Sequence, residues 1–413
     1  MDNLTHTLVG VLVGETAARA TGSRPSGLDA DTRRNLFVTV MAVGSNLPDL
    51  DFIRSRVIGS KLDYLLHHRG HTHTILGALA IAALLYLACE AWCRRRRRPL
   101  DRLDRYQLAG ISGLAALLHI ALDATNSYGV HPFWPFDNRW YYGDAIFIVE
   151  PLFWAACAPL VFIVRSLVAK TLISLALVAG IVLSFVTGMV PTSLAIALVM
   201  LTVVMLAVGK LARPRVALVT GLLVWFAINA TFAQASAVAK RRMQAIAHHQ
   251  FPTVDLIDIV LTPLPVNPMC WQVLLVQSEV ELVYVRRALL SIAPGLIPAS
   301  QCPSRGDVDR TTAPYAPSDA ANTPTIVWQG EIATPRQRLL EWQQKDCRAA
   351  AFMRFARAPW LIERDSAWVI GDARFDHEPE LGFAEIELGD ASDEPCVAYV
   401  PPWEPPREDV LRE

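Results

Sequence analysis

The sequence predicts an α-helical integral membrane bundle of six to eight apolar helices, followed by a mainly β soluble domain. Hydrophobic residues make up 53% of the 413 residues, and the long apolar runs all lie before residue 234. After that point the apolar runs are short, rich in β-branched and aromatic residues, and separated by Pro, Gly and Asp, which is typical of strands joined by turns. We therefore divide the chain into helical parts over 1–145 and 146–233 and a soluble part over 234–413.

The membrane-spanning helices are predicted from length and composition. An apolar helix needs about 20 residues to cross a bilayer. Six runs approach that length: 74–93, 107–124, 146–164, 171–189, 192–209 and 216–233. Two shorter stretches, 4–18 and 35–47, could form tilted spans, re-entrant segments or helices packed against the others. The N-terminus does not resemble a signal peptide, because Asp2 stands where a basic segment is expected and His6 interrupts the apolar run.

The orientation of the helices is predicted from the placement of Lys and Arg. With eight elements, one set of loops carries sixteen of these residues and the opposite set carries five. Positive residues favour the cytoplasmic side, so the richer set, which includes the run Arg94–Arg98, is predicted to be cytoplasmic. Lys240, Arg241 and Arg242 argue the other way, although charge beside a long domain has less influence. The soluble part is therefore predicted to lie on the non-cytoplasmic side.

Histidine and aspartate residues cluster at the ends of the first four apolar elements. In an up-and-down bundle these ends reach one face, opposite the basic loops. Imidazole nitrogens and carboxylates suit zinc first, with manganese or iron as alternatives. The pattern predicts one or two divalent ions at that face. The candidate metal ligands are His6, Asp49, Asp51, His68, His73, His119 and Asp123.

The spacing within these clusters also favours metal binding. His119 and Asp123 are four positions apart, so on a helix both side chains share one face. Asp49 and Asp51 are two apart, and an extended backbone would point both carboxylates the same way. Seven candidates exceed the four ligands of a closed zinc site, so either two ions share the site or some candidates orient ligands or act as a general base. At least one carboxylate among Asp49, Asp51 and Asp123 could act as general base or bridge two ions, and we expect the base to be one of the LPDLD pair.

Each cluster also has a plainer interpretation. His6 could be an interfacial residue, the two aspartates of LPDLD could cap a helix or form a turn, and residues 67–73 could be a basic interfacial loop. His119 with Asp123 is harder to explain in this way, because ionisable residues inside apolar segments are costly and mark function.

Four motifs in order resemble those of a known family. They are Thr5–His6, LPDLD, HRGHTH, and an HxxxDxxxxYG pattern that runs from His119 to Gly129. This order is similar to that of the YdjM-like family of bacterial inner-membrane proteins, described as predicted metal-dependent hydrolases, over about residues 1–150. The resemblance implies an inner-membrane hydrolase that draws its metal ligands from the seven candidates. His71 occupies a variable position of the motif and is not an expected ligand.

A weaker resemblance concerns the reaction. Zinc-dependent phospholipase C also uses helical His and Asp at this spacing, which implies a phosphoester or lipid-linked substrate here. Arg69 could then hold a phosphate with its planar guanidinium as a catalytic residue, or it could contact a lipid headgroup. In the aromatic loop 125–145, His131 and Asp144 could orient ligands. Membrane lipid is the expected partner, and no nucleic acid is expected.

The soluble part is long enough for its own core. It is predicted to be mainly antiparallel β, with a helix near 335–350 and a loop rich in Pro and Ala over 303–324. An oxidising periplasm would permit disulfides, and four cysteines allow three pairings. These cysteines are Cys270, Cys302, Cys347 and Cys396. No catalytic set stands out in this part, so it could gate the site or bind substrate.

Two functions of different class follow from these patterns. The first is a metal-dependent hydrolase acting at the periplasmic face of the inner membrane. The second is a non-catalytic membrane protein in which a structural metal stabilises the helix bundle and the β domain binds a partner. An open coordination position discriminates the two, because structural sites are normally closed whereas catalytic sites keep water or substrate.

Overall fold

The computed structural model of the chain describes residues 1–21, 28–53, 57, 59–304, 311–364, 367–390 and 392–411. These residues form two compact units, and each unit is built from several stretches of chain. The first unit is Met1–Leu50, His71–Trp134 and Ile146–Phe232, and the second is Asp51–Gly70, Pro135–Ala145 and Ala233–Glu413. The predicted charge asymmetry counts Arg24, Arg54 and Arg56, which lie outside the described residues.

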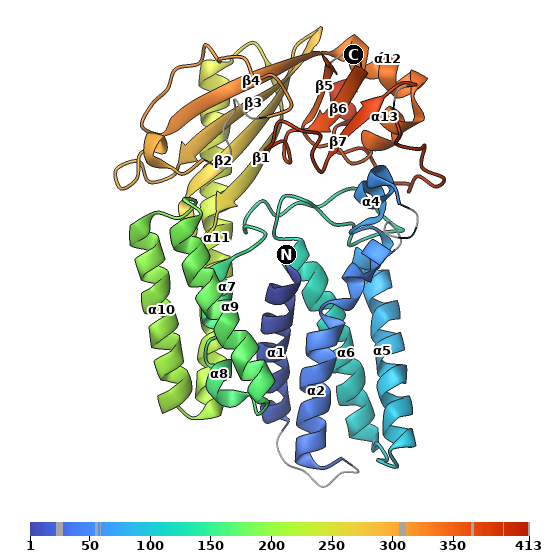
Figure 1. Cartoon of the computed structure of the whole chain (residues 1–413), viewed down its shortest axis with the longest axis vertical. Coiled ribbons are helices and arrows are strands. Elements are labelled where there is room, and N and C mark those ends of the chain that lie inside the picture. Colours follow the sequence, from blue (N-terminus) through green and yellow to red (C-terminus); the bar gives the residue numbers. More distant parts are fainter. Residues whose placement is uncertain are drawn as a thin grey trace. The chain divides into compact units, whose positions relative to one another are not determined.

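The predicted fold class is confirmed, since apolar helices make up the N-terminal half and antiparallel sheets follow (Figure 1). The first unit begins with four long helices, α1 (Asn3–Ala20), α2 (Ala30–Gly44), α5 (Ile75–Arg95) and α6 (Arg102–Asp123). α1 packs on α2, α2 on α6, and α6 on α5, so the four form one bundle. The helices begin at side chains that accept a free amide of the first turn. These caps are Asp2, Asp29, Thr74 and Asp101.

α1 and α2 approach closely because two glycines of α1 face α2. A β-carbon at Gly10 would lie 2.8 Å from the carbonyl oxygen of Met41, and one at Gly14 would be similarly crowded by α2. Small residues let membrane helices come this close. As a result the end of α2 meets the start of α1, where the Ser45 hydroxyl donates a hydrogen bond to the His6 carbonyl at 3.0 Å. This contact positions the next segment, the 3-10 helix η1 (Leu47–Asp51).

The later helices of the first unit are α7 (Pro151–Ala156), α8 (Leu160–Ile163), α9 (Leu167–Val186), α10 (Thr192–Leu211) and the start of α11 (Pro214–Gln250). Among the described residues, five helices are long and apolar enough to cross a membrane, namely α5, α6, α9, α10 and α11. The two shorter predicted stretches form the regular helices α1 and α2.

One predicted span is corrected. The sequence predicted a single helix over 146–164, whereas the structure has the short helices α7 and α8 there. Proline has no amide hydrogen for helical bonding and its ring crowds the preceding turn. Pro159, just after α7, therefore separates the two helices, and α8 begins directly after it.

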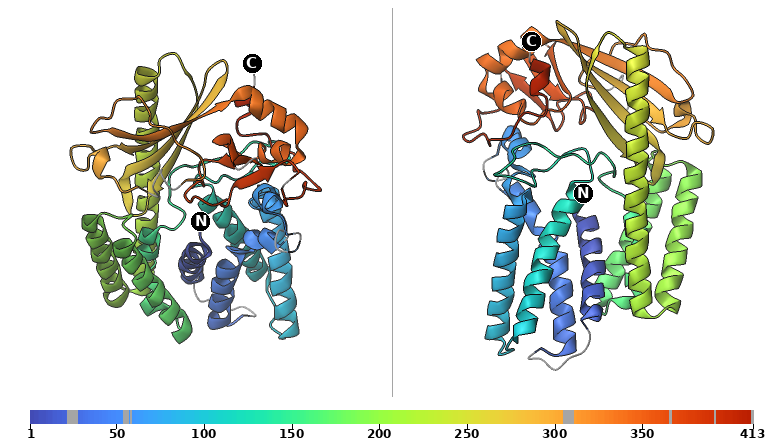
Figure 2. Two further views of the ribbon diagram at one scale, coloured as in Figure 1. Left: turned by 45° about the horizontal axis from the view of Figure 1, so that its top comes forward. Right: turned by 180° about the vertical axis from the view of Figure 1, so that it is seen from behind.

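The second unit is mainly β. β1 (Asp255–Leu264), β2 (Asn267–Ser278), β3 (Leu282–Ser291) and β4 (Ile326–Pro335) form one antiparallel sheet in chain order. β5 (Pro359–Arg364), β6 (Ala367–Asp372) and β7 (Glu385–Leu388) form a second antiparallel sheet (Figure 2). The remaining elements are α4 (Lys61–His67), α12 (Arg336–Lys345), α13 (Cys347–Phe352), η3 (Ala299–Gln301) and η5 (Glu408–Leu411).

The core of the second unit lies between the first sheet and the last part of α11. Ala239 and Met243 of the helix pack against the fully buried Trp271 of β2. The single helix predicted near 335–350 is divided in two, because the Asp346 side chain accepts the amide of Arg348 and starts α13.

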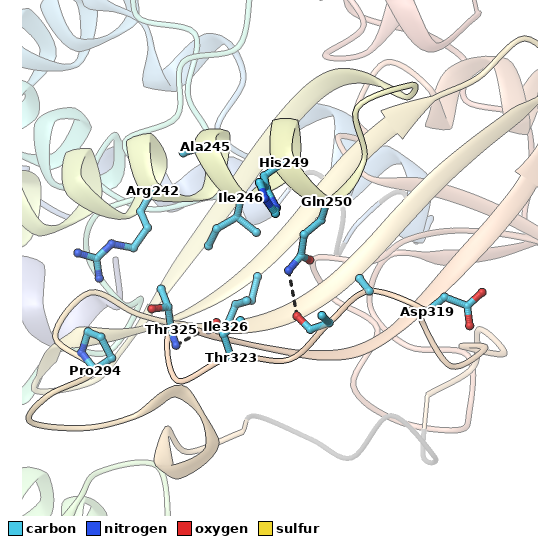
Figure 3. Close-up of a pocket in the computed structure, with 12 residues that line it drawn as sticks. Arg242, Ala245, Ile246, His249, Gln250, Pro294, Asp319, Thr323, Thr325 and Ile326 are labelled. Carbon is cyan, nitrogen blue, oxygen red and sulfur yellow. Dashed lines mark hydrogen bonds between the residues drawn. The ribbon is translucent and has the colours of Figure 1, made fainter.

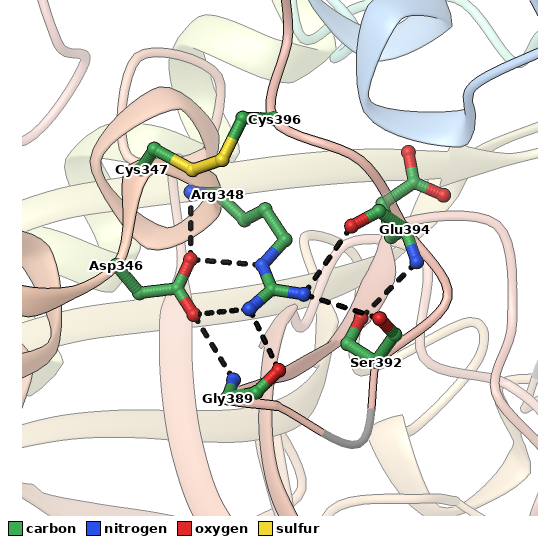
Figure 4. The surroundings of a disulfide bond; sticks show 7 residues. All are labelled: Asp346, Cys347, Arg348, Gly389, Ser392, Glu394 and Cys396. Atoms are coloured by element: carbon green, nitrogen blue, oxygen red, sulfur yellow. Dashed lines mark hydrogen bonds and ion pairs between the residues drawn. A yellow bond between two sulfur atoms is a disulfide. The ribbon is translucent and has the colours of Figure 1, made fainter.

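Two disulfides close loops in this unit. Cys270 pairs with Cys302 and Cys347 pairs with Cys396, which selects one of the three pairings that the sequence left open. Around the second bond, the Arg348 guanidinium donates to the Asp346 carboxylate at 2.7 Å and to the Gly389 carbonyl at 2.8 Å (Figure 4). The Cys347–Cys396 disulfide and the Arg348 hydrogen bonds together hold the segment after β7 against α13.

Candidate metal centre

Four of the predicted ligands meet in the first unit. Asp49 lies on η1, His73 on the 3-10 helix η2 (His71–His73), and His119 and Asp123 on the last turns of α6. Each offers one nitrogen or carboxylate oxygen, and these four atoms lie within 4.8 Å of one another. We call Asp49, His73, His119 and Asp123 the quartet. The four-residue spacing on α6 places its two members on one face, as the sequence predicted.

The distances within the quartet are those of ligands around one ion. The two Nε2 atoms of His73 and His119 are 2.9 Å apart. His73 Nε2 lies 3.4 Å from Asp49 Oδ1 and 3.2 Å from Asp123 Oδ2, and His119 Nε2 lies 3.4 Å from each of the same two oxygens. Zinc bonds of about 2.0–2.1 Å in a tetrahedron separate ligand atoms by about 3.3 Å. The donor set therefore fits a divalent metal.

Both imidazoles are oriented by their other nitrogen. The carbonyl oxygen of Ser45 lies 2.7 Å from His119 Nδ1, and because a carbonyl can only accept, Nδ1 carries the proton. Nε2 of His119 is then a lone-pair donor that faces the carboxylates. Thr72 Oγ1 lies 3.0 Å from His73 Nδ1, and this hydroxyl can either donate to or accept from the ring nitrogen. Such outer contacts fix the ring and tautomer of metal-binding histidines.

His6 lies directly beside the quartet. Its ring stacks on that of His119 at 4.0 Å between centroids, and its Nε2 is 3.2 Å from Asp123 Oδ1. His6 is fully buried, and its Nδ1 has no hydrogen-bond partner among the described residues. The amino group of Met1 also contacts Asp123 Oδ1, so a cation already lies against this carboxylate. His6 is thus a fifth candidate ligand.

The quartet is buried, and Asp49 is its most exposed member. His73, His119 and Asp123 are fully buried, whereas Asp49 is 8% exposed. Burial alone would raise the pKa of Asp49, but the adjacent imidazoles of His119 and His73 outweigh this effect and hold the pKa well below its usual range. Asp49 is therefore a carboxylate, the form that binds a metal.

The other predicted site residues belong to the second unit. His68 Nδ1 lies 2.9 Å from Asp51 Oδ1, and the backbone amide of Arg69 donates to Asp51 Oδ2 at 3.0 Å. Arg69 has a φ of 60° and is buried. Asp51, His68 and Arg69 thus form a local group around one carboxylate. Their roles as ligands or catalytic residues stay predictions.

Two residues of the site were not predicted. Ser45 acts through its backbone carbonyl, and residue type does not reveal which carbonyl will face a histidine. Thr72 lies inside the HRGHTH motif, and its place next to His73 was the available signal. Asp144, a predicted orienting residue, instead binds the Arg357 guanidinium of the second unit through both oxygens at 2.8 Å.

A hollow of about 830 Å³ in the second unit contains none of the predicted site residues (Figure 3). It lies between α11 and the segment 319–326, where the Gln250 amide donates to the Ala321 carbonyl at 2.9 Å. Arg242 and Asp319 on its lining carry opposite charges. We assign no chemistry to it.

Comparison with known proteins supports a relationship for the helical half. A family model described as YdjM inner membrane protein matches residues 1–209, about half of the chain. The uncharacterized protein YfhP of Bacillus subtilis (strain 168) is 30% identical over 146 residues, which cover 34% of this chain and 39% of that protein. The chain thus spans about two fifths of the length of this relative. No solved structure matches the chain significantly.

Proposed function

This chain belongs to the family of YdjM inner membrane proteins, and from that premise we propose that it is a membrane-bound, metal-dependent hydrolase. One observation carries the proposal. Two imidazoles whose Nδ1 atoms are engaged turn their Nε2 atoms toward two carboxylates, at distances of 3.2–3.4 Å. Such a set of two nitrogens and two oxygens favours zinc, with manganese or iron as alternatives.

The residues of the quartet have separable roles in this proposal. A divalent metal held there would supply an activated water at neutral pH and polarise the bond to be cleaved. Three residues are fully buried and would fix the metal in place, namely His73, His119 and Asp123. Asp49 lies at the less buried edge, so its carboxylate is the one placed to meet a substrate or to accept a proton.

The proposed substrate is a phosphoester or a lipid-linked compound. Support comes from the family's inner membrane location and from the position of His119 and Asp123 at the end of the apolar helix α6, which an amphiphilic substrate can reach by lateral diffusion. Asp51 and Arg69 remain our proposed additional catalytic residues, Asp51 as a base and Arg69 as a phosphate-binding cation.

The burial of the quartet also favours a second function. Structural metal sites are closed, and three of the four quartet residues are fully buried. In that case the metal joins α6 to η1 and η2, and the protein has no hydrolytic activity.

Metal analysis with an activity panel tests both functions. Full-length protein is purified in detergent and its metal content is measured. Its hydrolysis of generic phosphoesters and carboxylic esters is then assayed. We expect about one metal per chain, and His73→Ala should lose both the metal and the hydrolysis. His248→Ala, which removes an exposed histidine outside the quartet, is the matched control and should retain both.

The outcomes separate the two functions. Full metal with no hydrolysis of any ester in the panel favours the structural site. Equal metal content in wild type and His73→Ala overturns the metal centre itself.

The periplasmic orientation is also a proposal. It predicts that a reporter active only outside the cytoplasm, fused after Glu413, is active. Cys270 and Cys302, which are disulfide-bonded, should then resist thiol labelling until reduced. An inactive reporter with freely labelled thiols would place the soluble part in the cytoplasm.

A further inference from the structure

The first unit contains a long apolar groove away from the quartet residues. It measures about 610 Å³ and runs between α1, α2 and α9. Its walls are mostly aliphatic and include Leu4, Leu8, Val11, Val38, Leu172 and Ile173. Along α1 the lining extends from Leu4 to Glu15, a helical length of about 16 Å. This is about half of the ~30 Å hydrocarbon core, the depth that the chains of one leaflet fill.

A basic pocket adjoins one end of this groove. It measures about 270 Å³, and Arg34 and Arg165 line both the pocket and the groove. The remaining charged members of the pocket are Arg19, Arg33, Arg215 and Asp31. The lining of the pocket is thus dominated by guanidinium groups.

The pocket has an excess of positive charge after its ion pairs are counted. Arg33 is neutralised by the buried Asp104 at 3.3 Å. Arg19 and Arg34 both contact the same carboxylate, Glu15. Arg165 pairs with Asp31 at 2.7 Å, and Arg215 is exposed.

Apart from the Arg33 pair, four guanidinium groups therefore face two carboxylates. The Arg165–Asp31 pair is more than 60% exposed on both sides, and exposed pairs of this kind are weak. Arg165 can accordingly exchange Asp31 for a stronger anion.

We propose that the groove and the pocket together bind an anionic phospholipid, with its phosphate against Arg165, Arg34 and Arg215 and one acyl chain along α1 and α9. Guanidinium groups match the geometry of phosphate oxygens. Basic pockets between membrane helices bind anionic headgroups. A zwitterionic headgroup would bring its ammonium toward arginines, so the site discriminates against it. The aliphatic walls of the groove can bury an acyl chain, which free phosphate lacks, so the proposed ligand is a lipid.

Lipid retention tests the site. Full-length protein is purified in detergent, equilibrated with mixed micelles of phosphatidylglycerol and phosphatidylcholine, repurified, and its bound lipid quantified by mass spectrometry. The double variant Arg165→Gln/Arg215→Gln should lose bound phosphatidylglycerol by about fivefold for each arginine removed. The double variant Lys210→Gln/Arg213→Gln has the same charge change at exposed positions outside the groove, and it should bind as wild type does.

A second pair of variants tests the acyl chain. Ala169 lines the groove, whereas its neighbour Val168 is exposed on α9 and does not. Ala169→Trp should reduce lipid retention, and Val168→Trp should not. Thermal unfolding of each variant reports whether the unit has folded, so loss of the groove is distinguished from loss of the fold.

Three results would overturn the proposal. They are equal loss in both charge-changing variants, equal retention of phosphatidylcholine and phosphatidylglycerol, and displacement of the lipid by inorganic phosphate alone. The readout is bound lipid, so the result does not depend on whether the quartet is catalytic.

Discussion

Both units pair buried carboxylates with arginines, but the two carboxylates of the quartet in the first unit lie against imidazoles instead. In the second unit, Asp144, Asp258 and Asp372 are buried and each binds an arginine. In the quartet of the first unit, the buried carboxylates of Asp49 and Asp123 lie against imidazoles, and Asp123 also contacts the amino group of Met1. A buried charge must be paired or must bind a metal. The comparison therefore distinguishes carboxylates that bind arginines from the quartet carboxylates, which could hold a metal ion.

The arginine network of the second unit is complete within itself. Arg357 binds both oxygens of Asp144 at 2.8 Å and reaches Asp258 at 2.7 Å. Arg407 adds a contact to Asp258 at 2.9 Å. Burial raises the pKa of Asp258, but the two arginines outweigh it and lower the pKa to about 2. No further cation is needed there.

The second unit also shows a third way to neutralise buried acids. Asp376 accepts the backbone amides of Thr312 and Ala313, and Glu385 accepts those of Gly382 and the Thr312 hydroxyl. Burial, together with the neighbouring Asp376 carboxylate, raises the pKa of Glu385 to about 7. The quartet carboxylates instead lie against imidazoles and, for Asp123, against the amino group of Met1, a set that could hold a metal ion.

The largest expected effect is loss of the metal. His119→Ala or Asp123→Ala should reduce the metal content from about one per chain to near zero, because each removes one of four ligands. The protein should still reach the membrane, since insertion depends on the apolar helices. Elemental analysis of the purified membrane fraction measures the metal content. One metal per chain in both variants would contradict the assignment of His119 and Asp123 as ligands.

The next effect concerns the stability of the second unit. Arg357→Met leaves Asp144 and Asp258 buried without their main partner, so it should lower the free energy of unfolding by about 3–5 kcal/mol. Hydrogen exchange of β1 measures the change. Arg338→Met, at an exposed ion pair, is the control and should change stability by less than about 1 kcal/mol. Metal content should stay unchanged in Arg357→Met, and a loss there would show that the two charge clusters are not independent.

The third effect separates metal binding from catalysis. Asp→Asn changes keep shape while removing charge and basicity. We expect that either Asp49→Asn or Asp51→Asn retains much of its metal yet loses about a hundredfold or more of the hydrolysis rate, the usual scale for a lost acid or base. Metal content and rate are measured on the same preparations. If the rate follows the metal content in every variant, neither aspartate is the general base.

The smallest expected effect is a pH dependence of stability. The folded pKa of Glu385 is raised from its ordinary value near 4.5 to about 7, so its contribution is present below pH 4.5 and is lost as the pH rises to 7. Glu385→Gln should remove this loss and stabilise the protein by about 2 kcal/mol at pH 8. Thermal unfolding of the full chain at pH 5 and pH 8 tests it. A variant with the same pH dependence as wild type would assign the proton elsewhere.

The sequence by itself determined the membrane environment of the helices and the fold class, and it named the four residues that form the quartet. Long apolar runs predict spanning helices because the bilayer offers no partner to an open backbone. Short runs rich in β-branched and aromatic residues, separated by Pro, Gly and Asp, predicted the sheets for a similarly local reason. His119 and Asp123 were predicted as a pair because four positions on a helix bring side chains to one face, whatever the rest of the chain does.

Only the tertiary structure decided which candidates meet. Asp49 joins the quartet, whereas Asp51 Oδ1 lies 2.9 Å from His68 Nδ1. The segment is a 3-10 helix and not the extended strand that the sequence suggested, yet one carboxylate oxygen of Asp49 and one of Asp51 still lie within 4.8 Å of each other. Likewise, the carbonyl of Ser45 orients His119 because Gly10 allows α1 and α2 to approach closely. Such contacts join distant positions through packing, and no local pattern encodes them.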